Sequence, residues 1–280
     1  MQHKRILVTG ANGYLGRHVV NALLALNQEV LACDLKFDEV NPHAHRISEP
    51  IFSGASDIYQ RMGAPDVCLH LAWRDGFLHN SPAHMGDLSA HYTFLLNMLE
   101  GGLPHVAAMG SMHEVGYWEG AIDENTPTNP LSMYGIAKNS LRQAMALMAE
   151  SHGAVYQWLR GFYILGDDLH NHSIFSRITQ LEAQGAATFP FTTGKNRFDF
   201  IYIDELAKQI AYAVCQEEVT GIINCCSGRP VSLAEQVEMF LKQHHFSIRP
   251  EYGAYPDRPY DSPGMWGDPA KIQRIVAMFT

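Results

Sequence analysis

The chain has 280 residues and a formal net charge of −9, with 20 Lys and Arg against 29 Asp and Glu. Its apolar fraction of 46% and charged fraction of 18% are those of a globular protein, and its length fits one two-lobed unit. An acidic chain without a cluster of Lys and Arg is a poor candidate for binding nucleic acid or an anionic membrane, so we expect neither as a partner.

Signals for targeting and for metal binding are weak. No run approaches the roughly 18 apolar residues of a membrane span, and the first residues lead directly into a strand-like segment, without room for a signal peptide. The five cysteines form no C-x-x-C pair and mostly lie in apolar runs, which predicts buried, reduced thiols in a cytoplasmic protein. The 15 histidines include no H-E-x-x-H motif, so we expect no metal site.

The first forty residues follow the order strand, Gly-rich turn, helix, strand and acid. Residues 6–8 form an apolar run typical of a buried parallel strand, and the next turn carries Gly10, Gly13 and Gly16. A helical pattern leads to a second apolar run at 30–33, which ends at Asp34. This order predicts the first half of a dinucleotide-binding unit.

Each glycine of the turn has a physical role in such a unit. Gly10 permits the tight turn, Gly13 lets the backbone approach a pyrophosphate, and Gly16 lets the helix pack closely on the strand. Asp34 lies 18 residues after Gly16, near the spacing of a carboxylate that accepts hydrogen bonds from an adenosine ribose. The alternative is a helix-capping turn that binds nothing.

The alternation of strands and helices continues along the chain. We expect strands at 67–72, 106–109 and 155–159 and helices at 83–100 and 132–151, which predicts a doubly wound α/β (Rossmann) parallel sheet. After residue 160 the pattern becomes less regular, with a helix to about 184, a strand at 200–203 and a helix at 204–217. We therefore assign 1–160 and about 197–218 to a dinucleotide-binding domain, and about 161–196 and 219–280 to a small C-terminal substrate-binding lobe.

Tyr134 and Lys138 lie four residues apart, on one face of a predicted helix. The reference pKa of a tyrosine, about 10, is too high for a base at neutral pH. A nearby ammonium and a positive nicotinamide ring would favour the phenolate, which makes Tyr134 a candidate acid/base at a carbinol or carbonyl oxygen. Ser111, at the carboxyl end of a predicted strand, can hydrogen-bond the same oxygen.

These motifs, in this order, resemble the extended short-chain dehydrogenase/reductases, the NAD-dependent epimerase/dehydratase family. The resemblance rests on T-G-A-N-G-Y-L-G at 9–16, His70-Leu71-Ala72, Ser111, and Tyr134 with Lys138. Further matches follow at 159–160, Gly166, 199–204, 223–224 and Arg258-Pro259, so that nearly the whole chain is covered.

The resemblance implies which residues bind each partner. For NAD, with NADP possible, it implies Gly10, Asn12, Gly13, Tyr14, Leu15, Gly16, Asp34, Asp57, Ile58, Leu71, Ala72, Trp73, Tyr134 and Lys138. For a nucleotide-sugar substrate it implies Trp73, Ser111, Met112, Tyr163 and Arg258. Asp34 would repel the 2′-phosphate of NADP, whereas the nearby Arg17 and Lys36 would weaken that preference.

Two departures from the family pattern bear on the substrate. The family arginine before Asp199 is Phe198 here, and Arg197 would point to the opposite face of the strand. The asparagine expected three residues after Arg160 is Tyr163. One anchor for a substrate diphosphate is therefore in question, and the substrate lobe is expected to be reduced.

The segment at 111–117 permits two alignments. Aligned on Glu114-Val115, it replaces the Thr-Asp of the hexose 4,6-dehydratases by Met112-His113, which removes the acid of the elimination step. Aligned on Gly116, it makes Ser111 catalytic and resembles the epimerase-reductases that form GDP-fucose. His113 and His172 could then move protons beside a transient ketone, since the pKa of histidine is near neutral; the alternative is that both are ordinary polar residues of the pocket.

The resulting hypothesis is NAD(P)-dependent redox at a sugar carbinol, with an epimerase favoured. A keto-sugar or other carbonyl reductase is the alternative enzyme, and a non-catalytic dinucleotide sensor is the alternative from another class. In the family the helix after Tyr134 builds a four-helix contact between subunits, so the resemblance implies a homodimer.

Overall fold

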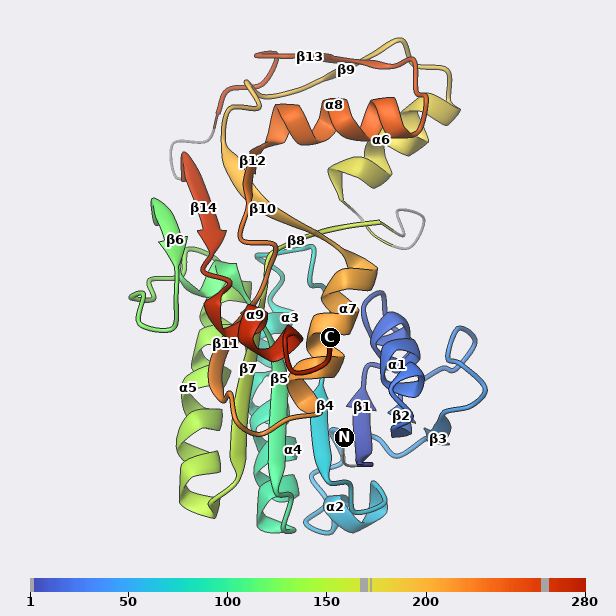
Figure 1. Ribbon diagram of the computed structural model, residues 1–280, viewed down its shortest axis with the longest axis vertical. Coiled ribbons are helices and arrows are strands. Elements are labelled where there is room, and N and C mark those ends of the chain that lie inside the picture. The colour runs from blue at the N-terminus through green and yellow to red at the C-terminus, as the bar shows by residue number, and fades with distance from the viewer. Residues whose placement is uncertain (1–2, 167–170, 172, 258–261) are drawn as a thin grey trace.

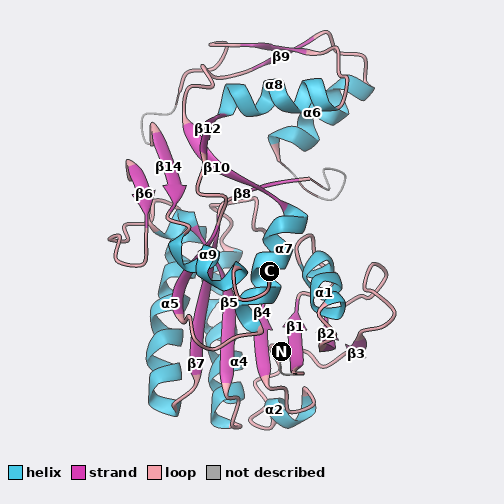
Figure 2. Ribbon diagram, in the orientation of Figure 1, coloured by secondary structure: helices cyan, strands magenta, loops and turns pink. Residues whose placement is uncertain are grey.

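The computed structural model describes residues 3–166, 171, 173–257 and 262–280 (Figure 1). A large lobe, in the lower part of Figure 1, contains a seven-stranded parallel sheet, and a smaller lobe carries helices α6 and α8 above it. Figure 2 shows long helices beside the strands of the large lobe and short strands in the smaller one.

The seven strands run in the order β11-β7-β5-β4-β1-β2-β3, and every pair is parallel. Their bounds are β1 Arg5–Thr9, β2 Glu29–Cys33, β3 His45–Ile47, β4 Val67–His70, β5 His105–Ser111, β7 Val155–Gly161 and β11 Gly221–Cys225. The order reverses at β1, which has β2 on one side and β4 on the other. The doubly wound fold is confirmed, and such a reversal opens a crevice at the carboxyl ends of the strands.

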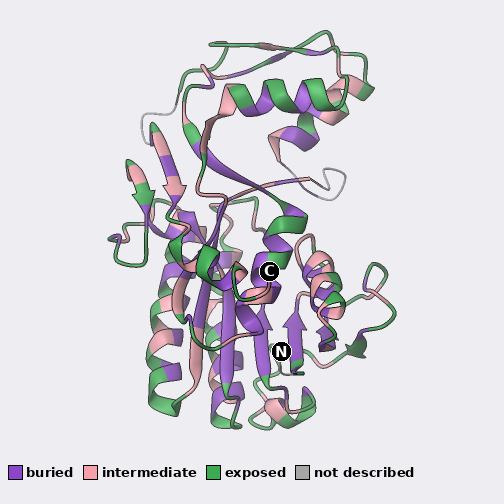
Figure 3. Ribbon diagram, in the orientation of Figure 1, coloured by how far each residue is buried: buried purple, intermediate pink, exposed green. Residues whose placement is uncertain are grey.

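Helices cover both faces of this sheet. Because side chains alternate along β1, Ile6 and Val8 join one apolar core and Leu7 joins the other. Three helices cover the first face: α1 (Gly16–Ala25), α7 (Ile203–Val214) and α9 (Ala270–Val276). Four helices lie on the second: α2 (Ile58–Arg61), α3 (Ala83–Gly86), α4 (Leu88–Glu100) and α5 (Met133–His152). Burial of the central strands along their length, visible in Figure 3, explains their continuous apolar runs.

The smaller lobe is built on a second sheet of five strands. Strands β12 (Pro230–Ser232), β10 (Arg197–Tyr202), β14 (Gly264–Gly267) and β6 (Gly120–Ile122) lie in that order, and β8 (Tyr163–Leu165) also pairs with β10. Helices α6 (Ile174–Ala183) and α8 (Leu233–Gln243) and the strand pair β9 (Thr188–Pro190) and β13 (Arg249–Glu251) complete the lobe around a core rich in Phe.

Strand pairing moves two segments across the expected domain boundary. The sequence places β11 within 219–280, the expected substrate lobe, but β11 pairs with β7 in the central sheet. Helix α9, from the same segment, packs against α7 and β11. β10 was assigned to the dinucleotide-binding domain, yet its partners are β8, β12 and β14. Both strands are short, so the choice of sheet depends on contacts distant in sequence.

No helix among the described residues is long and apolar enough to cross a membrane. Within the same residues, no group of three or more His, Cys, Asp or Glu side chains is arranged to hold a metal ion. All five cysteines are buried and unpaired.

Candidate active site

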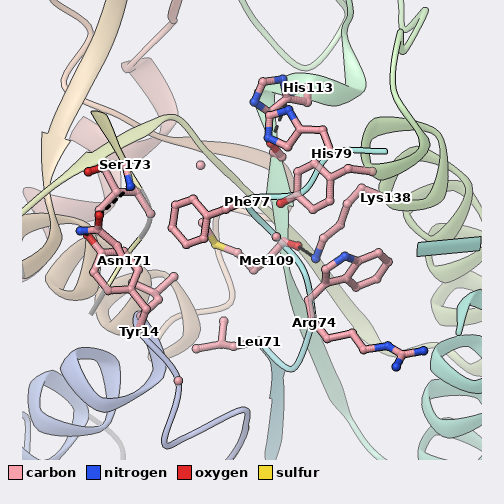
Figure 4. A pocket seen from close by; sticks show the side chains of 18 of the residues that line it. Tyr14, Leu71, Arg74, Phe77, His79, Met109, His113, Lys138, Asn171 and Ser173 are labelled. Atoms are coloured by element: carbon pink, nitrogen blue, oxygen red, sulfur yellow. Dashed lines mark hydrogen bonds between the residues drawn. The ribbon is translucent and has the colours of Figure 1, made fainter. Parts of the chain in front are cut away.

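A cavity of about 1290 Å³ opens between the two lobes, at the carboxyl ends of the central strands. The Gly-rich turn, the end of β2 and the segment after β4 line one part of it, and β8, β10 and the start of α6 line another. Figure 4 shows Lys138, His79 and His113 on one side, facing Tyr14, Asn171 and Ser173 on the other.

The Gly-rich turn packs too closely for side chains at two of its positions. A Cβ on Gly16 would lie 2.0 Å from the carbonyl oxygen of Gly10, and a Cβ on Gly10 would lie 2.7 Å from the amide nitrogen of Ala72. Gly10 also has a φ of +71°, which favours glycine. Because Gly16 begins α1, the turn leads directly into a helix N-terminus, a cradle that fits a pyrophosphate.

Asp34 closes the turn at the end of β2. Its carboxylate accepts hydrogen bonds from the backbone of Asn12 (2.8 Å) and from its own neighbour Leu35 (2.7 Å), and it lines the cavity. The side-chain oxygen of Asn12 accepts from the amide of Glu39 at 2.8 Å. Asn12 therefore braces the loop around Asp34, and it does not line the cavity.

The residues expected to contact adenine, Asp57 and Ile58, lie outside the wall of the cavity. Ile58 is 1% exposed and belongs to the core shared with α4, whereas Asp57 is exposed, with its carboxylate 3.9 Å from the guanidinium of Arg61. Neither residue lines the cavity, and residues 48–52 occupy that edge instead. The single turn of α2 points its first residue inward, a direction that the sequence alone does not fix.

Three side chains of the predicted catalytic set meet in the cavity. The hydroxyl of Ser132 accepts a hydrogen bond from Gly135 and caps α5, so that Tyr134 and Lys138 occupy its first turns. The ammonium of Lys138 donates to the carbonyl of Met109 at 2.8 Å and lies 5.9 Å from the ring centroid of Tyr134. Ser111, at the end of β5, lines the same cavity and lies near enough to lower the pKa of the Tyr134 phenol.

Burial determines the protonation of this set in the protein without cofactor. Burial raises the pKa of Tyr134 to about 12, although the nearby Ser111 acts in the opposite direction. Burial also lowers the pKa of Lys138 to about 7, so its ammonium is a weaker source of positive field than expected. In the protein without cofactor, Tyr134 is therefore a neutral phenol and a proton donor, rather than a phenolate.

The position of Glu114 decides between the two alignments of the segment at 111–117. Its carboxylate accepts from the amide of Ser111 (2.5 Å) and the indole of Trp158 (2.9 Å), and it is fully buried away from the cavity. Met112 is likewise buried in the core, at 3% exposure, so its expected contact with substrate is corrected. Glu114 thus positions Ser111 and lacks the access that an elimination reaction would need.

Trp73 and His79 line the cavity around the catalytic set. The indole of Trp73 donates to Nδ1 of His84 at 3.0 Å, and its ring lies 3.8 Å from the ammonium of Lys138. His79 stacks on the ring of Tyr134, with centroids 5.5 Å apart and planes 10° apart. Sequence reasoning missed His79, although the expected loop after β4 was the place to search.

His113 occupies the cavity wall as predicted, with a different protonation state. Its ring lies 4.2 Å from that of His79 and 6.0 Å from that of Tyr134. Burial, with a smaller contribution from His79, lowers the pKa of His113 to about 3, far from the near-neutral value of a proton shuttle. Its proposed partner His172 lies outside the described residues, as does Arg258.

Residues 6–226 match the model of the NAD dependent epimerase/dehydratase family. The chain belongs to this family. The resemblance drawn from the glycine turn and from Tyr134 with Lys138 is therefore confirmed for the family as a whole.

Two curated relatives and one solved structure are similar to this chain. A protein of Aggregatibacter actinomycetemcomitans, dTDP-6-deoxy-L-talose 4-dehydrogenase (NAD(+)), is 43% identical over 94% of this chain and 98% of its own length. A putative UDP-glucose 4-epimerase of Methanocaldococcus jannaschii is 25% identical over 92% of this chain and 86% of its own. The solved UDP-N-acetylglucosamine 4-epimerase of Methanobrevibacter ruminantium M1 superposes with a TM-score of 0.84 at 21% identity, over 98% of this chain and 92% of the other, which supports the fold.

Proposed function

We propose that this protein is an NAD(H)-dependent oxidoreductase that interconverts the 4-hydroxyl and 4-keto forms of a nucleotide-linked sugar. The observation that carries the proposal is that Ser111, Tyr134 and Lys138 meet in one cavity, where the neutral phenol of Tyr134 can supply the proton that reduction of a ketone needs at its carbonyl oxygen. The relative with 43% identity, a 4-dehydrogenase, supports the same reaction class.

The cofactor part of the proposal rests on the fit of the turn at one end of the cavity. The amides around Gly13 and the N-terminus of α1 would hold the pyrophosphate, and the carboxylate of Asp34 would accept from the adenosine ribose. Leu71, Ala72 and Trp73 would line the groove between them. When bound, NADH supplies the hydride for reduction, and NAD⁺ accepts it for oxidation.

Each catalytic side chain has a distinct role in this proposal. Tyr134 donates its phenolic proton to the carbonyl oxygen during reduction and takes it back during oxidation. The hydroxyl of Ser111 hydrogen-bonds that oxygen, and Glu114 fixes its backbone. Lys138, anchored on the carbonyl of Met109, orients the nicotinamide ribose. Balanced for reduction, one ketone, one hydride and one proton give one alcohol.

We expect NADH to bind at least about tenfold more tightly than NADPH. Two backbone hydrogen bonds hold the carboxylate of Asp34 in place at the end of β2. A 2′-phosphate on the adenosine ribose would therefore lie beside this fixed negative charge and be repelled. Arg17 is engaged by Glu39 at 3.1 Å and is a poor compensating cation. Titration of both reduced cofactors into apo protein measures the ratio of their Kd values. We expect Asp34→Asn to reduce this ratio. Tighter binding of NADPH than of NADH to the native chain would contradict the preference.

A sugar 4-epimerase is the second candidate function, because two of the compared relatives carry that activity in their names. An epimerase returns its hydride and shows no net change in NADH over a turnover, whereas the proposed oxidoreductase consumes one NADH for each alcohol that it forms from a ketone. Absorbance of NADH, followed with a nucleotide-linked 4-keto sugar, separates them. Formation of the C4 epimer of an alcohol substrate without added NADH would contradict the proposal.

We expect product formed in deuterated water to carry no deuterium on carbon. The hydride comes from the cofactor, and the proton from Tyr134 enters an exchangeable hydroxyl. The low pKa of His113 also argues against proton removal beside the ketone, so His113→Gln should keep carbon-bound deuterium at the background level of an enzyme-free control. Deuterium on carbon that His113→Gln abolishes would instead establish the two-histidine mechanism.

The same proposal includes a cytoplasmic homodimer. Apolar side chains remain exposed around α4 and α5, namely Tyr92, Leu131, Met133, Ile136 and Leu147. Two copies that pair these helices would bury them, as the four-helix contact of the family implies.

A further inference from the structure

The two departures from the family pattern, Tyr163 and Phe198, contact each other in the structure. Their ring centroids lie 4.6 Å apart, and both rings line the cavity. Tyr163 is paired in register with Phe200, and their rings lie 5.6 Å apart. Because β8 pairs with β10, the three side chains form one continuous aromatic wall, defined here by Tyr163, Phe198 and Phe200.

This aromatic wall lies close to the catalytic set. The ring of Tyr163 is 6.4 Å from that of His113, which is 6.0 Å from that of Tyr134. One side chain therefore separates the wall from the proton donor. A sugar ring whose oxidised carbon reaches Tyr134 and Ser111 would place a substituent of a neighbouring carbon toward the wall.

Strand alternation keeps charge away from this face of β10. Arg197 and Asp199 lie on the opposite face, where the guanidinium donates to the carbonyl of Pro230 and the carboxylate accepts from Ser227 and Gly228. Phe198 and Phe200 are 9% and 8% exposed and offer no hydrogen-bonding atom on their side chains. His113 beside them is neutral because burial lowers its pKa to about 3.

We propose that the aromatic wall is a subsite for the C6 methyl group of a 6-deoxyhexose, and that it selects 6-deoxy sugars over sugars with a C6 hydroxyl. This inference rests on the proposed function and deepens it. A methyl group would pack on the faces of Phe198 and Phe200, whereas a hydroxymethyl group against these two rings would lose hydration without gaining a hydrogen bond. The hydroxyl of Tyr163 is the one polar side-chain atom of the aromatic wall, so the proposed methyl site lies on Phe198 and Phe200. The name of the relative with 43% identity, which specifies a 6-deoxy sugar, is consistent with this subsite.

The test compares two dTDP-linked sugars of the same configuration, one with a methyl group and one with a hydroxymethyl group at C5. Oxidation by NAD⁺ gives kcat/KM for each, and calorimetry with NAD⁺-loaded protein lacking the Tyr134 hydroxyl (Tyr134→Phe) gives each Kd. We expect the native chain to favour the methyl sugar by roughly 10- to 100-fold, the range that one small group in an apolar pocket supplies.

Two variants at one position connect the preference to the aromatic wall. Phe198→Leu keeps an apolar surface and should keep the preference, whereas Phe198→Ser should reduce it at least about tenfold, mainly by weakening the methyl sugar. NADH affinity should stay unchanged in both variants, because the Gly-rich turn lies at another part of the cavity, and this measurement also checks that each variant folds.

Equal kcat/KM for both sugars in the native chain would overturn the subsite, as would an unchanged preference in Phe198→Ser. If Phe198→Ser weakened both sugars and free dTDP alike, the wall would contact the nucleotide, which also overturns it. If neither sugar were oxidised, the proposed function would fail, while the two Kd values would still decide the subsite.

Discussion

Replacing Tyr134 with Phe is expected to lower kcat by about 10²- to 10⁴-fold and to leave the Kd of NADH nearly unchanged. The substitution keeps the ring that stacks on His79 and removes only the hydroxyl that would protonate the carbonyl oxygen. Steady-state turnover and a fluorescence titration with NADH measure the two quantities. Near-normal turnover of Tyr134→Phe would remove Tyr134 from the proposed mechanism.

The pH dependence of reduction follows from the same hydroxyl. Because burial raises the pKa of Tyr134 to about 12 in the cofactor-free protein, the proton-donating form is present at neutral pH and declines only as the pH rises toward that value. Bound cofactor would change this pKa. The profile of kcat/KM for the sugar, measured at saturating NADH, therefore reports the pKa of Tyr134 in the complex with NADH. Residual turnover of Tyr134→Phe should lack the alkaline decline attributable to the phenol.

Replacing Gly16 with Ala is expected to destabilise the fold by about 3 kcal/mol or more and to weaken NADH binding by roughly 10- to 100-fold. The added Cβ would lie 2.0 Å from the carbonyl oxygen of Gly10 and 3.0 Å from the carbonyl carbon of Ala11, all backbone atoms that cannot rotate away. Relief requires movement of the turn, which displaces the amides proposed to hold the pyrophosphate.

Gly86→Ala is the matched control for Gly16→Ala. Gly86 lies in α3 with open space around its Cβ position, so this change should leave both the melting temperature and the NADH affinity close to native values. Thermal unfolding and an NADH titration are measured on both variants. A native-like Gly16→Ala in both measurements would contradict the packing described for the turn.

The parts of the fold that were predictable from sequence are those determined by local pattern. The apolar run of β1, the glycine turn and the acid at Asp34 follow each other within one unit, and strand burial on both faces makes such runs conspicuous. Helix α8 was not predicted, although Ser232 and Glu235 form a capping box at its start. A capping box of this kind is a local pattern that the sequence alone contains.

The rest depended on contacts distant along the chain. Ile58 and Met112 were assigned to ligand contacts by their place in a motif, but their side chains turn into the core. His79 lies in the site because its loop folds back on the start of α5. There the backbone amide of Tyr134 donates to the carbonyl of His79, and the two rings stack. The pKa of Tyr134 likewise depends on burial, which the spacing to Lys138 does not encode.

In the proposed reaction, hydride passes from NADH to carbon in a net reduction, and NADH labelled with deuterium at C4 tests this transfer most directly. The protein is mixed with a dTDP-linked 4-keto-6-deoxyhexose and each of the two C4-labelled NADH diastereomers in turn, and the sugar product is weighed by mass spectrometry. We expect one deuterium at the former ketone carbon from one diastereomer only, and one NADH consumed for each product. Unlabelled product from both diastereomers, with NAD released only when the protein is denatured, would contradict it and identify an epimerase that retains its cofactor.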